Sequence, residues 1–389
     1  MGSPAFKKEL GTETFVFPLV FAAFFALFAA RMGLANTLNT MMNTAYRLLI
    51  DTVLYITAVC VIMGAISALL SEFGFVSLAN RVLQPLMRPV YGMPGASALG
   101  VVTTFLSDNP AILALAEDQN FRRFFKAYQF PALTNLGTAF GMGLIVCTYM
   151  YSLSPAMGQG LGLAVLIGLL GAVVGSVVST RLMLVFTKKH FGTEAALPPP
   201  EGESAELPAG MRPVRRGGVG NRVMSAILEG GHSGVKMGVA IVPGVLVVCT
   251  FVMMLINGPS ESGAYTGAAY EGIRLLPYLA GKIDFLLNPL FGFSSPEAVG
   301  VPVTALGAAG ASLSLTATLV RQGLVKANDI AVFTAMCMCW SGYLSTHTSM
   351  MDSLHCKELI GKAILSHTLG GLCAGVAAHW LYVLLSALG

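Results

Sequence analysis

Charged residues are scarce in this chain of 389 residues. Asp, Glu, Lys and Arg make up 11% of it, whereas a typical soluble domain contains about 25%. Apolar residues make up 55%, and the mean hydropathy is +0.72. These values exclude a soluble protein, and they exclude a single membrane anchor because one span needs only about 20 apolar residues. The net charge of +4 is too small and too scattered to indicate a nucleic-acid partner.

Motifs that carry catalysis are also absent from the sequence. It contains no Gly-x-Ser-x-Gly, no phosphate-binding loop, no dinucleotide fingerprint and no His-Glu-x-x-His. The seven cysteines lie almost entirely in apolar segments, which is not the pattern of a disulfide framework. We therefore expect neither an enzyme nor a protein with a bound cofactor.

Metal binding has one candidate cluster in the sequence. His347, Asp352, His355 and Cys356 lie within ten residues of one another. The two histidines are eight residues apart, whereas zinc sites commonly separate them by three to five residues. We expect no metal site, and a divalent metal permease is kept as an alternative.

Six apolar runs are long enough to span a bilayer, and two further runs are interrupted. The interruptions are Ser107-Asp108-Asn109-Pro110 in residues 96–116 and Gly307-Ala308-Ala309-Gly310 in residues 298–320. Each half of an interrupted run has only about ten residues and cannot cross alone. The pattern predicts two re-entrant helical hairpins, covered by protein or by a watery cavity. The six uninterrupted runs are residues 15–30, 52–70, 132–149, 160–186, 239–256 and 363–388.

The two interrupted regions are similar in sequence. Aligning residues 86–115 with residues 286–315, at a constant offset of 200, gives eleven identities in thirty positions. Such internal duplication is typical of transporter folds. If the hairpins return to their own side, each half crosses the membrane three times, and an odd number inverts the second half. We therefore predict an all-α polytopic membrane protein with two inverted repeats, about seven transmembrane helices and two re-entrant hairpins.

The expected organisation has four parts. Residues 1–50 form an N-terminal transmembrane helix and connector, and residues 51–187 form the first repeat. Residues 188–222, which contain Pro, Gly and mixed charge, form a flexible cytoplasmic linker before the second repeat at 223–389. With a cytoplasmic N-terminus, most Lys and Arg residues lie on the inner side. This predicts a multi-pass protein of the bacterial inner membrane, in contact with the lipid bilayer, and leaves a homo-oligomer open.

The first interruption is the first candidate site. An Asp at the centre of a bilayer costs at least about 2.5 kcal/mol, so it is retained where water or partners meet it. Asp108 is therefore a candidate ligand for a coupling ion, either sodium or a proton. Ser107 and Asn109 are candidates for hydrogen bonds to a solute. Capping of the returning half-helix by Asp108 or Asn109 explains the same residues without a ligand.

The start of the second interrupted run is the second candidate site. Ser294, Ser295 and Glu297 would bring two hydroxyls and a carboxylate to the mouth of a cavity. Helix capping accounts for the same residues: a serine caps, Pro296 suits the first turn and Glu297 complements the helix dipole.

The third candidate site consists of two polar helices, in residues 124–151 and 329–353. Gly137 and Gly342 would permit local unwinding, and the density of hydroxyl groups is higher than a lipid-facing helix carries. Interhelical hydrogen bonding is the alternative explanation. The candidate solute ligands are Asn135, Thr138, Ser345, Thr346 and His347, and the candidate ligands of a coupling ion are Thr134 and Ser349.

The sequence resembles a known membrane-protein superfamily. The run Gly-Met-Pro-Gly-Ala-Ser at residues 92–97, the two broken hairpins and the second copy at 292–302 are similar to the nucleoside-recognition, or Gate, domain. Its members include concentrative nucleoside transporters, the membrane part of ferrous iron transporter B and spore maturation proteins. In concentrative nucleoside transporters, hairpins and unwound helices hold a nucleoside and a sodium ion or proton. The resemblance implies the same arrangement here. The run from Ser294 to Glu297 looks like a loose version of that family's Thr-Glu-Ala-Pro signature, in a different order.

Together these observations predict a secondary active transporter of a small polar organic solute. A nucleoside or nucleobase is favoured, and the coupling ion would be sodium or a proton. We expect Asp108 and Asn109 to face Glu297 and Thr346 across the middle of the membrane. A second hypothesis, suggested by the spore maturation branch, is a membrane scaffold that transports nothing.

Overall fold

The computed structural model describes residues 9–109, 111–117, 119–197, 214–260 and 262–388. Pro110 of the first interruption, most of the expected linker and residues 1–8 lie outside the described residues. Regular structure in the described part is helical, with one isolated bridge between Lys126 and Ala196. The seven cysteines are free thiols.

Six helical spans in the described residues are long and apolar enough to cross a membrane. Four of the six uninterrupted apolar runs of the sequence fall within one of them, and the other two, residues 160–186 and 363–388, extend beyond theirs by only two residues and one residue. The protein is therefore an all-α, multi-pass membrane protein. The spans are Thr12–Met32, Leu34–Glu72, Ala132–Met157, Gly162–Phe191, Val219–Ile256 and Lys357–Ala387.

The second span is longer than the apolar run that predicted it. Helix α1 (Thr12–Met32) is followed by α2 (Leu34–Leu48), which continues through a π-helical turn, Leu49–Val53, into α3 (Leu54–Glu72). The expected boundary between residues 50 and 51 falls inside this continuous helix. A search for apolar runs misses α2 because threonines occupy its buried face at helical spacing. These are Thr37, Thr40 and Thr44.

The fifth span also starts before the apolar run that predicted it, because its first part is rich in small residues that pack against another helix. Helix α12 (Val219–Ala240) continues, after a π-helical segment Gly244–Cys249, into α13 (Thr250–Ile256). Its buried residues recur every four positions. A Cβ atom on Gly230 would lie 2.4 Å from the carbonyl oxygen of Gly64 in α3, so these helices touch along their backbones. The buried positions are Ala226, Gly230, Gly234 and Gly238.

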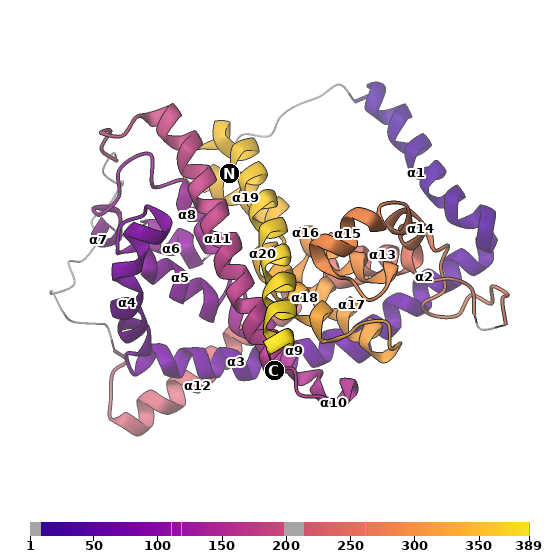
Figure 1. Ribbon diagram of the computed structural model, residues 1–389, viewed down its shortest axis with the longest axis horizontal. Coiled ribbons are helices and arrows are strands. Elements are labelled where there is room, and N and C mark those ends of the chain that lie inside the picture. The colour runs from indigo at the N-terminus through magenta and orange to yellow at the C-terminus, as the bar shows by residue number, and fades with distance from the viewer. Residues whose placement is uncertain (1–8, 110, 118, 198–213, 261, 389) are drawn as a thin grey trace.

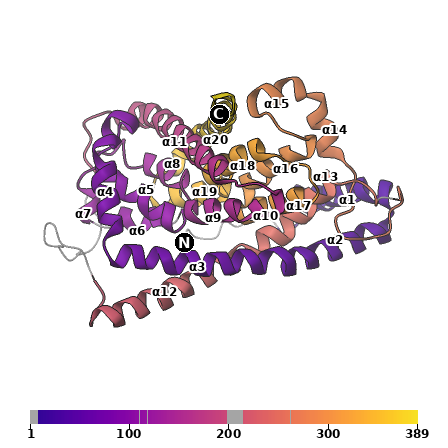
Figure 2. The same ribbon diagram turned by 60° about the horizontal axis from the view of Figure 1, so that its bottom comes forward.

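The centre of the molecule is a close crossing of two long helices, α11 (Gly162–Phe191) and α20 (Ile360–Leu388). A Cβ on Gly175 would meet the Gly370 carbonyl at 2.6 Å, and the reverse contact measures 2.7 Å. Elements α4 to α8 lie on one side of this pair and α13 to α17 lie on the other (Figure 1). Figure 2 shows α2 and α3 as one long rod beneath both groups, with α12 beside α3.

Both interrupted runs form helical hairpins. The first hairpin consists of α5 (Ser97–Leu106) and α6 (Ala111–Glu117), which fold back on each other so that a Cβ on Gly100 would meet Ile112 at 2.3 Å. The second hairpin consists of a 3-10 turn (Pro296–Val299), α16 (Gly300–Gly307) and α17 (Ala309–Arg321). The connectors before them are α4 (Phe75–Leu86) with a π-helical turn, Met87–Tyr91, and α14 (Leu275–Lys282) with α15 (Asp284–Phe291).

The two polar helices are broken, as the sequence predicts, but one break is displaced. In the second, α18 (Ala327–Cys339) and α19 (Tyr343–Ser353) meet at Gly342, whose φ is +65°. In the first, α8 (Ala132–Thr138) and α9 (Gly143–Ser152) are separated by residues 139–142, with Met142 at φ +55°. Gly137 stays helical, because it is the place where Ile112 packs against α8: a Cβ there would lie 3.2 Å from that side chain.

The remaining elements are short. They are α7 (Gln119–Arg122), α10 (Ser154–Met157) and a 3-10 turn at Lys357–Leu359.

Candidate functional site

The tip of the first hairpin is held by its own side chains. Helix α5 ends at Leu106, and the hydroxyl of the next residue, Ser107, donates to the Thr103 carbonyl over 2.6 Å. The Asp108 carboxylate accepts the backbone N–H of Asn109 over 2.7 Å. This bond links neighbouring residues of the tip and engages one oxygen of the Asp108 carboxylate. Capping of α6 and ligand binding by these residues both remain predictions.

Asn109 connects this tip to the second broken helix. Its amide nitrogen donates to the Ser341 carbonyl over 2.8 Å, in the break between α18 and α19. Asn109 is 1% exposed and Ser341 is 4% exposed. The Oδ1 atom of Asn109 and the hydroxyl of Ser341 are buried without a hydrogen-bond partner among the described residues. Such groups are costly to bury, so they are candidates for hydrogen bonds to a ligand.

The tip of the second hairpin meets the same break. Helix α16 ends at Gly307, Ala308 is extended, and α17 starts at Ala309. The backbone N–H of Gly342 donates to the Ala305 carbonyl of α16 over 3.0 Å. The first-turn amides of α17 and α19 have no carbonyl partner within their own helices, so two helix N-termini lie where the hairpins meet.

A cavity of about 490 Å³ lies at this meeting point. This volume is within the range of small-molecule sites, about 300–1,000 Å³. It is lined by both hairpin tips, both broken helices and the middle of the fifth span. The lining residues are Asp108, Asn109, Met142, Lys236, Met237, Ala240, Ile241, Gly244, Gly307, Ala308, Ala309, Gly310, Ser341, Gly342 and Thr346.

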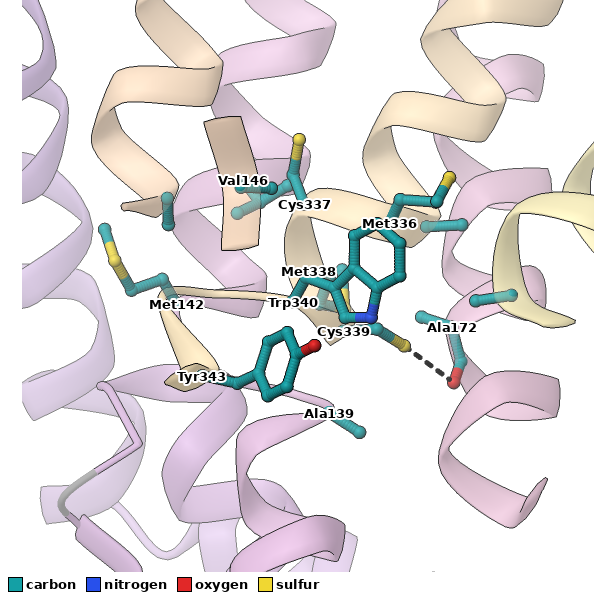
Figure 3. Packing of buried hydrophobic residues seen from close by; sticks show 14 of the residues in the cluster. Ala139, Met142, Val146, Ala172, Met336, Cys337, Met338, Cys339, Trp340 and Tyr343 are labelled. Carbon is teal, nitrogen blue, oxygen red and sulfur yellow. Dashed lines mark hydrogen bonds between the residues drawn. The ribbon is translucent and has the colours of Figure 1, made fainter. Parts of the chain in front are cut away.

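Large apolar side chains hold the second break from behind. The rings of Trp340 and Tyr343 lie nearly parallel, with centroids 6.3 Å apart. Figure 3 shows them near Met142 and near Cys339, whose thiol points at the carbonyl of Ala172 in α11 over 3.6 Å. The break is thus fixed to the central helix pair, and its backbone groups face the cavity from a rigid support.

Three of the expected site residues therefore line one cavity: Asp108, Asn109 and Thr346. Ser107 lines an adjacent cavity of about 380 Å³ between α3, α5 and α12. Ser349 is exposed on α19 and does not line the main cavity. Ser345 lies on α19.

Another group of expected residues forms a separate, fully buried polar network. Asn135 donates to the Ser179 hydroxyl over 3.0 Å, and this hydroxyl pairs with Nδ1 of His367 over 2.8 Å. The ring of His347 lies 4.5 Å from that of His367, centroid to centroid, and both its nitrogens lack a partner among the described residues. Thr134 and Thr138 are also buried in α8. These residues join α8 and α19 to the central helix pair and do not line the cavity.

The residues at the start of the second hairpin are engaged elsewhere. The Glu297 carboxylate pairs with Arg274 over 2.9 Å and does not line the cavity, so it does not face Asp108 as expected. Ser294 donates its backbone N–H over 2.9 Å, and its hydroxyl, to the buried Asp329. Ser295 is the cap residue of the following turn but makes no side-chain bond there. The side chain of Asp329, and not a capping serine, therefore fixes the start of the second hairpin.

The four residues of the candidate metal cluster do not come together. Asp352 pairs with Lys357 over 2.8 Å, and His347 is buried in the separate network. Within the described residues, no group of three His, Cys, Asp or Glu side chains has an arrangement that could hold a metal ion.

Sequence reasoning missed Lys236 and Ser341 as cavity residues. Lys236 lies in an otherwise uncharged stretch of the fifth span, from residue 230 to residue 256. That isolation was a usable signal, because a lone Lys in an apolar span marks a watery or functional position. The Ser341 hydroxyl belonged to the polar run, but nothing in the sequence distinguished it from its neighbours.

Comparison with known proteins identifies the fold. No protein-family profile and no curated protein matches the sequence. Among solved structures, the concentrative nucleoside transporter CNTnw in an inward-facing substrate-bound state matches with a TM-score of 0.52 and 14% identity, over 84% of this chain and 74% of that one. An outward-facing structure of a CNTnw double variant matches with a TM-score of 0.51 and 16% identity, over 94% and 83%.

The chain therefore has the fold of a nucleoside transporter structure, which agrees with the resemblance in the sequence. Both of these structures are of a transporter, CNTnw.

Proposed function

We propose that the protein is a secondary active transporter of a small polar organic solute, with a nucleoside or nucleobase as the favoured class. The observation that carries this proposal is the cavity of about 490 Å³ where both hairpin tips and both broken helices meet. Broken helices around a central site are the arrangement by which inverted-repeat transporters bind solute and ion. The CNTnw fold, seen in inward-facing and outward-facing states of that protein, supports the same class.

Each cavity residue has a chemical role in this proposal. The Oδ1 atom of Asn109 accepts a hydrogen bond from the solute, and the hydroxyl of Ser341 donates to it. The hydroxyl of Thr346, whose proton is donated to the Gly342 carbonyl, accepts a hydrogen bond from the solute. Asp108 holds the coupling ion, a sodium ion or a proton, because it is the carboxylate among the lining residues. Binding the ion neutralises this charge and lets the hairpin tip move through apolar surroundings.

We further propose an inverted relation between the halves, with a cytoplasmic N-terminus in a bacterial inner membrane. The distribution of Lys and Arg along the sequence supports this orientation. The central pairing of α11 with α20, the last helix of each half, supports two structural repeats.

Uptake into proteoliposomes tests the proposal. The purified protein should accumulate at least one labelled nucleoside or nucleobase under an imposed sodium or proton gradient, and not without a gradient. Lack of uptake for the whole panel under both gradients would contradict it. Copurification of a stoichiometric partner protein in that case would favour the scaffold hypothesis.

A matched pair of substitutions on α19 tests the position of the site. Thr346→Val removes a hydroxyl that lines the cavity, whereas Thr348→Val removes one from an exposed position. Both hydroxyls bond to the carbonyl four residues earlier, over 3.2 and 3.0 Å, so the local effect on the helix is the same. We expect uptake to fall about tenfold in the first variant and to stay unchanged in the second. Equal effects would place the solute elsewhere.

A further inference from the structure

Lys236 brings a positive charge into the proposed solute cavity. It lies in α12, within the fifth span, and between residues 230 and 256 it is the single Lys, Arg, Asp or Glu. An ammonium group in a bilayer is costly unless it meets water, a counter-ion or a polar ligand. Among the ion pairs of the described residues, none involves Lys236, and the neighbouring Asp108 is not paired with it.

Two helix N-termini add positive potential to the same cavity. Helix α17 has 13 residues and begins at Ala309, and α19 has 11 residues and begins at Tyr343. The residues at these starts, Gly310 and Gly342 among them, line the cavity. The backbone N–H groups of Gly342 and Tyr343 are bonded to the carbonyls of Ala305 and Trp340, so α19 contributes the partial positive charge of its N-terminus. Such a partial charge favours anions.

A buried donor lies beside these N-termini. The Ser341 hydroxyl, in a residue that is 4% exposed, has no partner among the described residues and belongs to the cavity lining. A hydroxyl donates readily to an oxyanion. The Lys236 cation, the two helix N-termini and the Ser341 hydroxyl therefore all favour an oxyanion group on the ligand.

Resting on the proposed transport function, we propose that the solute carries an oxyanion group, a carboxylate or a phosphate, which binds between Lys236 and the starts of α17 and α19. Asp108 is the one acidic residue of the lining, and its charge is cancelled when the coupling ion binds. The loaded cavity then has a net positive charge, which an anionic solute neutralises. A neutral nucleoside would leave Lys236 without a counter-charge.

Matched solute pairs test this assignment. Uracil is compared with uracil-6-carboxylate, and uridine with uridine 5′-monophosphate, in proteoliposomes and by ligand-dependent thermal shift of the wild-type protein. We expect at least one anionic member to be taken up at least tenfold faster than its neutral partner. The two pairs distinguish a carboxylate from a phosphate.

Substitutions at position 236 give the second measurement. Lys236→Gln should lower the ratio of anionic to neutral solute uptake at least tenfold, whereas Lys236→Arg should retain the preference. Val239→Gln is the matched control, because Val239 lies on the same helix, is 60% exposed and does not line the cavity. If Lys236→Gln folds poorly, the thermal shifts of the wild-type protein still decide.

The outcomes separate this inference from the proposed function. Preference for the neutral members, with the ratio unchanged in Lys236→Gln, would overturn the anionic assignment and leave the transporter proposal standing. No uptake and no thermal shift with any of the four solutes, or with the wider panel, would overturn both.

Discussion

The two hairpins come from segments that are similar in sequence, and they differ most where they meet the cavity. The offset of 200 that aligns the segments pairs Ser107 with Gly307, Asp108 with Ala308 and Asn109 with Ala309. One tip carries a hydroxyl, a carboxylate and an amide, whereas the other carries no polar side chain. The polar tip supplies charge and hydrogen-bonding side chains, and the other supplies backbone amides and a close approach.

Outside the tips, the two copies retain the same local devices. The Thr104 hydroxyl donates to the Gly100 carbonyl over 2.8 Å, and Thr304 donates to Gly300 over 2.7 Å. Both connectors end on a glycine in the left-handed region, at positions 92 and 292, with φ of +71° and +59°. Residues that shape the hairpin are thus the same in the two segments, and residues that face the cavity differ.

The largest expected difference is between substitutions at the two tips. Asp108→Asn removes the carboxylate that we propose to hold the coupling ion, and it should lower gradient-driven uptake about 100-fold, a change of about 2.7 kcal/mol at 1.36 kcal/mol per decade. Ala308→Ser, at the equivalent position, should change it less than threefold. Initial rates of uptake in proteoliposomes measure both. Similar losses in both variants would mean that the tips do not have different roles.

Asn109 provides the next comparison. Asn109→Ala leaves the buried carbonyl of Ser341 without its 2.8 Å donor, which should cost about 1–3 kcal/mol of stability. Ala309→Ser, at the equivalent position, should cost nothing measurable. Thermal unfolding in detergent compares them. Unchanged unfolding of Asn109→Ala would show that the amide does not join the hairpin to α18 and α19.

The two hairpins should differ in how far a second substitution restores the stability that is lost when a closely packed glycine is replaced. Gly100→Ala would bring a Cβ within 2.3 Å of the terminal carbon of Ile112, so Ile112→Val should restore the stability lost, about 1–3 kcal/mol. Gly300→Ala would meet the terminal carbon of Ile256 at 2.1 Å, but also Leu315 at 3.2 Å. Ile256→Val should therefore rescue it only in part. Double-mutant cycles of thermal stability measure this, and full rescue in both hairpins would refute the difference.

The smallest expected effect concerns the equivalent threonines Thr104 and Thr304, at which the two hairpins should behave alike. Thr104→Val and Thr304→Val each remove a hydroxyl bond to the carbonyl four residues earlier, and Thr104→Val also removes a longer contact of 3.2 Å to the Val101 carbonyl. Each should cost no more than about 0.6 kcal/mol, the typical value for a hydrogen bond between membrane helices. The two losses should agree within error, because the bonds are equivalent. A clearly larger loss at one position would show that its hydroxyl also serves another partner.

Much of the fold could be predicted because its signals are local. Pro and Gly, together with short half-lengths, marked both hairpins, and Gly342 marked the second break. The first break was misplaced, because the glycine at 137 serves the approach of Ile112, while Met142 adopts the left-handed conformation. A glycine in a polar helix thus indicates either unwinding or close packing, and the sequence does not distinguish the two.

The candidate site was predicted only in part, because it joins segments distant in sequence. Asp108 and Asn109 stood out as polar residues in an apolar run. Glu297 stood out for the same reason, yet its carboxylate is bound by Arg274 and it does not line the cavity. The sequence identifies a residue that is costly to place in an apolar run, but it does not identify the partner that offsets this cost.

By itself, the sequence determined the membrane environment, the helical class, the similarity of the two hairpin segments and most of the places where helices break. Each of these depends on hydropathy or on backbone preferences within a few residues. The tertiary structure decided which breaks meet. It placed Lys236 and Ser341, which are 105 positions apart, in the lining of one cavity, because the close contacts of α11 with α20 and of α3 with α12 bring distant segments together. It also paired Glu297 with Arg274, 23 positions away. The charge of the cavity, and hence the solute it favours, follows from that packing.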